Sequence, residues 1–144
     1  MTYQRLWAGI LVASLSCGSP QQAPAGASVQ DSLPTEFSLT VGEERGIAGV
    51  KIVFQAVRGD SRCPSDAQCV WAGDATAVVK VLPSAGTGAS QELLLHTNAE
   101  PRWGEALGLR VTLMSLAPVP SVAKPPRAEE YVVKLEIRRP SSGR

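Results

Sequence analysis

The chain has 144 residues, 44% of them hydrophobic and 19% charged, with 14 Lys and Arg against 13 Asp and Glu. Nucleic acids and anionic surfaces are bound by clustered excess Lys and Arg, so this balance gives no reason to expect either as a partner. Three cysteines are present, and what they do depends on the compartment in which the protein folds.

The first 16 residues are typical of an export signal. Arg5 gives a short basic start, an apolar run follows from Leu6 to Leu15, and Ser16 ends the segment. A bilayer needs about 20 apolar residues to be spanned, so the run predicts a secretory signal and not a transmembrane helix. We therefore expect residues 1–16 to be removed on export.

Cys17 stands directly after the apolar run, behind a small residue and ahead of a polar segment. This arrangement resembles the lipobox of bacterial lipoproteins, whose cysteine becomes the lipid-modified, palmitate-bearing first residue of the mature protein. The pattern departs at Ser14, where the family usually has Leu, and Ser14 with Ser16 also satisfies the small-x-small rule of an ordinary secretory cleavage site. The resemblance implies an exported lipoprotein held to the membrane of the cell envelope through Cys17. The alternative is a soluble secreted protein.

Residues 17–34 are rich in Pro, Gly, Ala, Ser and Gln and contain almost no large apolar side chain. Such a segment cannot bury enough apolar surface to offset the entropy of ordering it, so we predict a flexible linker. Its r.m.s. span is roughly 20 to 25 Å.

Removal of the signal also removes Arg5, which leaves 13 basic residues against 13 acidic ones. Arg138 and Arg139 are expected to be solvated strand ends.

Residues 35–140 are long enough for one domain and too short for two, and residues 141–144 are predicted to be a disordered tail. Apolar and polar side chains alternate in six stretches of this domain, which is typical of half-buried strands. No window offers ten or more residues at helical spacing with a cap at each end. The stretches are 37–41, 50–57, 75–82, 91–97, 107–113 and 131–137.

Turn residues separate these stretches. Gly, Pro, Asp and Ser cluster at 41–49, 58–66, 83–90 and 117–128, and residues 98–106 are predicted to be a polar loop. Six to seven short antiparallel strands predict a single all-β domain, either a sandwich or a partly open barrel. The order of the strands stays open.

Cys63 and Cys69 have five residues between them. A redox pair normally has two, and structural zinc needs four ligands, whereas the one histidine, His96, is more than twenty residues away. If Cys17 is lipidated, Cys63 and Cys69 are the two cysteines that remain. An even number of cysteines in an exported protein predicts a structural disulfide. On the chain-entropy model a loop of this size is worth about 2 to 2.5 kcal/mol.

Alternation is expected to continue after Cys69, ahead of a strand that starts near Ala75. Alternation would then place Cys69, Trp71 and Gly73 on one face, with Trp71 over the disulfide or over a neighbouring strand. Gly73 would allow a bulge or the close approach of another backbone.

Four charged residues lie in or beside the disulfide loop: Asp60, Arg62, Asp66 and Asp74. An ion pair between Arg62 and an aspartate would tie the loop to a strand, and a surface cluster that orders the loop is the favoured interpretation. Three carboxylates could instead bind a calcium ion, although their spacing does not match an EF-hand. These four residues and Trp71 are the candidate binding residues, and we predict no catalytic residue, metal ligand or cofactor.

The motif SRCP at residues 61–64, followed after four residues by C-x-W-A-G at residues 69–73, resembles a group of uncharacterised bacterial secreted and lipoprotein domains. The resemblance covers residues 36–139. It implies a small β domain with a disulfide, outside the cell. The group carries no assigned activity, so no catalytic residue is transferred.

We expect a non-enzymatic, monomeric envelope lipoprotein domain with a binding or structural role. One alternative is a secreted protease inhibitor that presents residues 61–68 with Arg62 as the inserted residue, since a small rigid loop is ordered before binding. A second alternative is a metal-binding or hydrolytic site, which requires His96 to meet Asp60, Asp66 or Asp74 in a cleft.

Overall fold

The computed structural model describes residues 32–140. Four predicted features lie outside the described residues: the signal peptide 1–16, the lipidation site Cys17, the linker 17–34 except its last three residues, and the tail 141–144. These four features stay predictions.

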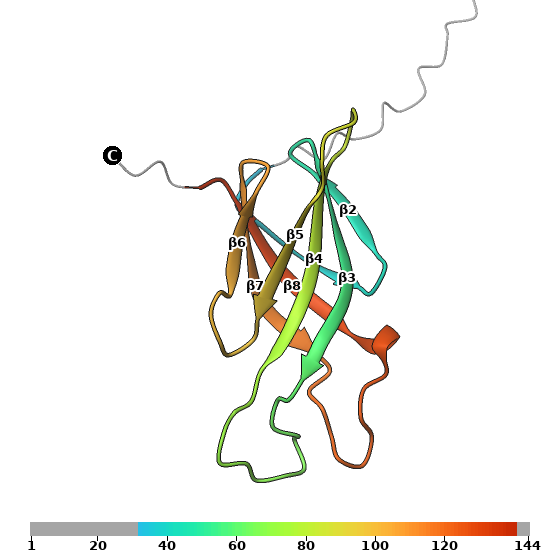
Figure 1. Cartoon of the computed structure of the whole chain (residues 1–144), viewed down its shortest axis with the longest axis vertical. Coiled ribbons are helices and arrows are strands. Elements are labelled where there is room, and N and C mark those ends of the chain that lie inside the picture. Colours follow the sequence, from blue (N-terminus) through green and yellow to red (C-terminus); the bar gives the residue numbers. More distant parts are fainter. Residues whose placement is uncertain (1–31, 141–144) are drawn as a thin grey trace, which may run out of the picture. The chain divides into compact units, whose positions relative to one another are not determined.

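Eight antiparallel strands form two four-stranded sheets that pack face to face (Figure 1). Sheet A has the order β1-β8-β7-β6 and sheet B the order β2-β3-β4-β5. The predicted all-β sandwich is therefore confirmed, and the sheets do not close into a barrel. The strands are β1 (Thr35–Thr40), β2 (Glu44–Ile47), β3 (Val50–Asp60), β4 (Ala75–Pro83), β5 (Gln91–His96), β6 (Trp103–Ala106), β7 (Leu109–Ala117) and β8 (Val132–Arg138).

Alternation along the strands produces a single apolar core between the sheets. In β8, Val133, Leu135 and Ile137 are fully buried, and they face Ile52 and Phe54 of β3, which are also fully buried. Burial of one such side chain contributes about 1.5 to 3 kcal/mol, so these inner faces provide most of the driving force for folding.

Two of the eight strands lie where the sequence predicts turns or loop. β2 falls within residues 41–49 and β6 within residues 98–106, and each has only four residues. Each contributes one buried side chain, Ile47 or Ala106, so neither shows an apolar repeat. Both are edge strands, where short length and polar composition limit unwanted pairing with other chains.

The only described helix is a 3-10 turn, η1 (Ala128–Glu130), which precedes β8. Within residues 32–140, no helix is long and apolar enough to cross a membrane.

The two ends of the sandwich are built differently. At the end that we call the loop end, residues 61–74 connect β3 to β4 and residues 118–131 connect β7 to β8 (Figure 1). At the opposite end, called the entry end, Thr35 begins β1 opposite Ile137 of β8. The 11 residues of β3 run from one end to the other, a distance of about 35 Å.

Candidate functional site

The segment of residues 61–74, called the disulfide loop, contains the cysteine pair. Cys63 and Cys69 form a disulfide with their Cα atoms 5.8 Å apart, which confirms the predicted pairing. The stem of the loop continues the pairing of β3 with β4: the Ser61 amide donates to the carbonyl of Asp74 (2.8 Å) and the Cys63 amide to that of Ala72 (2.9 Å).

Gly73 makes this stem possible. Its φ angle is +67°, in the left-handed region, and a Cβ atom at this position would collide with the backbone carbonyl of Ser61. The predicted close approach of another backbone at Gly73 is therefore confirmed, and glycine is the one residue that fits.

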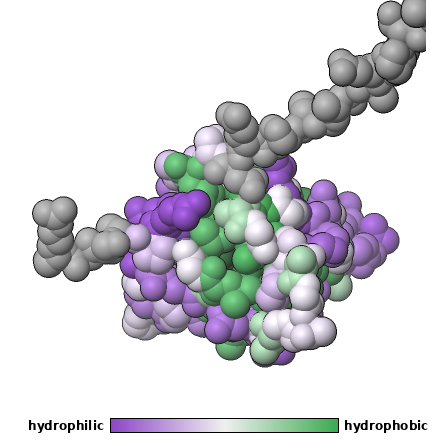
Figure 2. Space-filling model, turned by 90° about the horizontal axis from the view of Figure 1, so that it is seen from above, coloured by the Kyte–Doolittle hydropathy of each residue, from purple (hydrophilic) through white to green (hydrophobic). Residues whose placement is uncertain are grey.

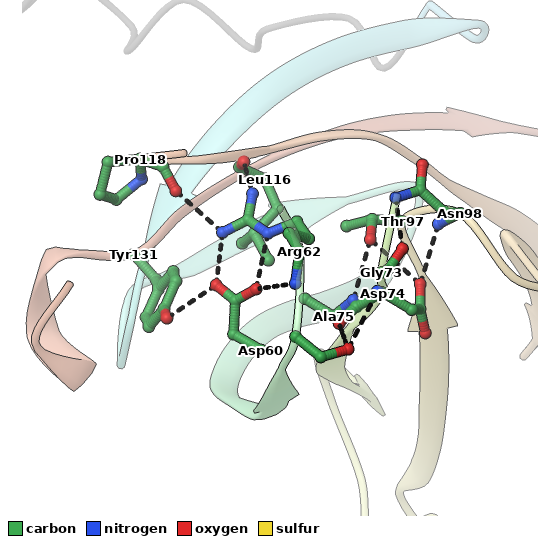
Figure 3. A network of polar contacts seen from close by, with 11 residues as sticks. Asp60, Arg62, Gly73, Asp74, Ala75, Thr97, Asn98, Leu116, Pro118 and Tyr131 are labelled. Carbon is green, nitrogen blue, oxygen red and sulfur yellow. Dashed lines mark hydrogen bonds and ion pairs between the residues drawn. The ribbon is translucent and has the colours of Figure 1, made fainter. Parts of the chain in front are cut away.

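Arg62 is the centre of a polar network at the base of the loop (Figure 3). Its guanidinium binds the Asp60 carboxylate through two hydrogen bonds, Nε to Oδ1 at 2.9 Å and Nη2 to Oδ2 at 2.6 Å. The same guanidinium donates to the carbonyls of Leu116 (2.6 Å) and Pro118 (2.8 Å), and the Tyr131 hydroxyl donates to Asp60 Oδ2 (2.9 Å). The network joins β3 to the start and the end of residues 118–131.

The Arg62–Asp60 pair is well shielded from water. The two side chains are only 10% and 9% exposed. Burial alone would raise the pKa of Asp60, but the hydrogen bonds from Arg62 and from Tyr131 outweigh it and hold that pKa below its usual value. The predicted ion pair between Arg62 and an aspartate is present.

Asp66 fastens the disulfide loop to residues 118–131, called the proline loop. Its carboxylate accepts hydrogen bonds from the Ser121 hydroxyl (2.7 Å) and from the amides of Val122 (2.8 Å) and Ala123 (3.2 Å). The bond from the Val122 amide is the largest cause of an Asp66 pKa lowered to about 2. The Ser65 amide adds a bond to the Pro120 carbonyl at 2.9 Å.

Asp74 fastens the other side of the disulfide loop to the β5–β6 connection. Its Oδ1 accepts from the amides of Asn98 (2.8 Å) and Ala99 (3.2 Å) and from the Thr97 hydroxyl (3.0 Å), while Oδ2 lies 2.6 Å from Nδ1 of His96. Burial opposes ionisation, yet the bonds from Asn98 and His96 dominate and place the pKa of Asp74 far below its usual range. The side chains of His96 and Asp74 are 25% and 27% exposed.

The three aspartates therefore do not converge on one site. Each holds a different pair of segments, and within residues 32–140 no group of three His, Cys, Asp or Glu side chains could hold a metal ion. His96 does meet Asp74, as the hydrolytic alternative requires. Asp60 and Asp66 take no part in that contact because each is bound by its own partners.

The inhibitor alternative depends on a displayed Arg62. The side chain is instead turned inward and is bound to two carbonyls of another loop as well as to Asp60. Insertion into a protease would require all of these bonds to break, so the geometry does not favour this hypothesis.

Trp71 lies neither over the disulfide nor over a strand, so that prediction is wrong. Its side chain is 81% exposed and that of the preceding residue, Val70, is 92% exposed. The alternation expected after Cys69 does not hold either, because the backbone makes a left-handed turn at Gly73, and the strand begins at Ala75, as predicted.

The proline loop adds further apolar surface to the same end. Val119 and Val122 are 59% and 66% exposed. Beside them lies a hollow of about 550 Å³ with apolar walls and three polar lining residues. Its apolar walls are Ala117, Pro118, Val119, Pro126 and Val132, and its polar lining residues are Ser121, Lys124 and Glu130.

The functional partners that sequence reasoning missed are mostly backbone groups. The carbonyls of Leu116 and Pro118 and the amides of Val122 and Ala123 carry no residue-type signal. Tyr131 had a signal, since a tyrosine at the end of a loop can send its hydroxyl to a buried carboxylate.

Comparison with protein-family models, curated proteins and solved structures finds no match. The resemblance to uncharacterised secreted and lipoprotein domains therefore stays a prediction.

Proposed function

We propose that this protein is a non-enzymatic binding domain, anchored to the bacterial cell envelope through Cys17, that engages a protein partner with its loop end. The observation that carries the proposal is the exposure of Trp71 and Val70 on a loop that is otherwise held rigidly. Contiguous apolar patches on an ordered surface mark interaction sites, and Val70 and Trp71 are neighbours in such a patch.

The rigidity of the disulfide loop favours binding because ordering costs are met before a partner arrives. The disulfide, the Arg62–Asp60 pair and Asp66 fix the loop at three points. Tryptophan is among the residues that carry most of the energy in protein interfaces, where it fills an apolar pocket of the partner. Trp71 is placed to act as such an anchor.

The charges of the loop end favour a protein partner over an anionic surface. In the proline loop, Arg127 is paired with Glu129 and Glu130, and Lys124 lies 3.9 Å from Glu130. These cations are neutralised within the loop, whereas an anionic lipid or nucleic acid surface would need them free. The binding surface is thus apolar, with Val119 and Val122 beside the hollow.

Photo-crosslinking in cells tests this proposal. A benzophenone amino acid is placed at Val70, at Val122 and, as a control, at Leu94 of β5, which is 42% exposed on the side of the sandwich. We expect positions 70 and 122 to give one discrete adduct of the same mass, and position 94 to give none. Adducts at all three positions, or at none, would contradict a specific protein-binding surface. An adduct of twice the chain mass would identify a second copy of this chain as the partner.

Anchoring has its own test. The chain and its Cys17→Ser variant are expressed and separated into membrane and soluble fractions. We expect the original chain in the membrane fraction and the variant in the soluble one. If both chains fractionate identically, Cys17 is not the anchor.

A further inference from the structure

The entry end of the sandwich has an amphipathic surface. Figure 2 views the molecule from this end and shows an apolar area in the middle, with hydrophilic side chains around it. Leu107, in the turn between β6 and β7, is 39% exposed, and Leu33 is a partly buried side chain packed against the core. This is the end at which the residues before 32 join the described domain.

Two free cations lie at the same end. Arg138 and Arg139 are exposed, and within the described part of the chain neither forms an ion pair. With Leu33, Pro34 and Glu136 they line a hollow of about 310 Å³. Glu136 offsets one of the two charges, so the hollow keeps a net positive charge. The balanced total charge of the chain hides this local excess.

The length of the linker decides which end can reach the membrane. Fourteen residues lie between Cys17 and Ser32, and a segment of that length spans roughly 20 Å if it is flexible, as predicted. The longest strand, β3, extends about 35 Å from the entry end to the loop end. An anchored domain therefore meets the membrane most readily with its entry end.

We propose that the entry end rests on the membrane that holds Cys17, with Arg138 and Arg139 on lipid phosphates and Leu107 at the interface. Trp71 then faces away from that membrane. This orientation rests on the proposed anchoring through Cys17, and it specifies that the protein partner approaches from the aqueous side. Each basic residue near an anionic leaflet strengthens the attachment of a protein to the membrane roughly fivefold. The two arginines together therefore favour this orientation by about 30-fold.

Depth-dependent fluorescence quenching tests the orientation. The lipidated mature chain is placed in vesicles of phosphatidylcholine and phosphatidylglycerol with brominated acyl chains, which quench only nearby indoles. One variant keeps Trp71 as its sole indole through Trp103→Phe, since Trp7 leaves with the signal. The second carries Leu107→Trp with Trp71→Phe and Trp103→Phe.

We expect strong quenching of the indole introduced by Leu107→Trp and none of Trp71. Arg138→Gln with Arg139→Gln should abolish most of the quenching at position 107. The matched control is Lys80→Gln with Arg102→Gln, which removes the same charge from two cations that also form no ion pair within residues 32–140. This control should leave the quenching unchanged.

Two results overturn the proposal in different ways. If the chain floats with the vesicles but the indoles at positions 71 and 107 are quenched equally, the orientation is refuted and the anchoring stays intact. The same holds if the control variant loses as much quenching at position 107 as the variant without Arg138 and Arg139. A chain that does not float with the vesicles refutes the anchoring through Cys17, and the orientation with it.

Discussion

The two halves of the disulfide loop have opposite roles. Residues 61–66 carry Arg62 and Asp66, whose polar groups are bound within the domain, in part by Asp60 at the end of β3. Residues 70–71 are apolar, yet Val70 and Trp71 are 92% and 81% exposed. Polar residues therefore hold the loop and apolar residues are displayed by it, which reverses the usual distribution of side chains between interior and surface.

The largest effect is expected from breaking the Arg62–Asp60 pair, which is shielded from water. Arg62→Ala leaves the Asp60 carboxylate buried without its partner, and loss of one member of a buried ion pair costs about 3 to 5 kcal/mol. The free energy of unfolding, measured by urea titration, should fall by that amount. Arg58→Ala is the matched control: it removes an exposed pair with Glu92 and should change stability by less than about 0.5 kcal/mol. Equal effects of the two variants would show that Arg62 does not hold the loop.

Removal of the disulfide should have a smaller effect. Cys63→Ser with Cys69→Ser releases a short loop, so the expected loss in unfolding free energy is about 2 kcal/mol on the chain-entropy model. The hydrogen bonds of Arg62 and Asp66 remain in this variant, so the fold should survive. A variant that no longer folds would mean that the sulfurs, and not the polar network, determine the loop.

Acidification should gradually weaken the bonds that hold both sides of the disulfide loop. Asp60, Asp66 and Asp74 all have folded-state pKa values below their ordinary ones, and that of Asp66 is about 2. Their stabilisation is thus present above about pH 4, where the unfolded chain is also ionised, and is lost as pH falls toward 2. Asp66→Asn should flatten the unfolding free energy plotted against pH in this range. An unchanged slope would contradict the fastening role of Asp66.

The sequence predicts the fold better than it predicts the site, for physical reasons. Alternation at β3, β4 and β8 reflects burial of one strand face, a local property that any strand of sufficient length shows. β2 and β6 are too short to show it. The cysteine pairing followed from spacing and compartment.

The error at Trp71 has a different origin. The prediction continues the alternation past Cys69, ahead of the strand, and places a large aromatic residue against the interior. The turn at Gly73 breaks the alternation. The carbonyl partners of Arg62 and the amide partners of Asp66 could not be read from the sequence, since they are backbone groups more than 50 residues away.

The most direct test of this division of roles is the adduct formed by a photo-crosslinker at Val70, compared between the original chain and its Trp71→Ala variant. Trp71 is mostly exposed, so the substitution should change the unfolding free energy by less than about 0.5 kcal/mol. We predict that the adduct is lost while the domain stays folded. An undiminished adduct in the folded variant would contradict the claim that Trp71 is displayed for binding.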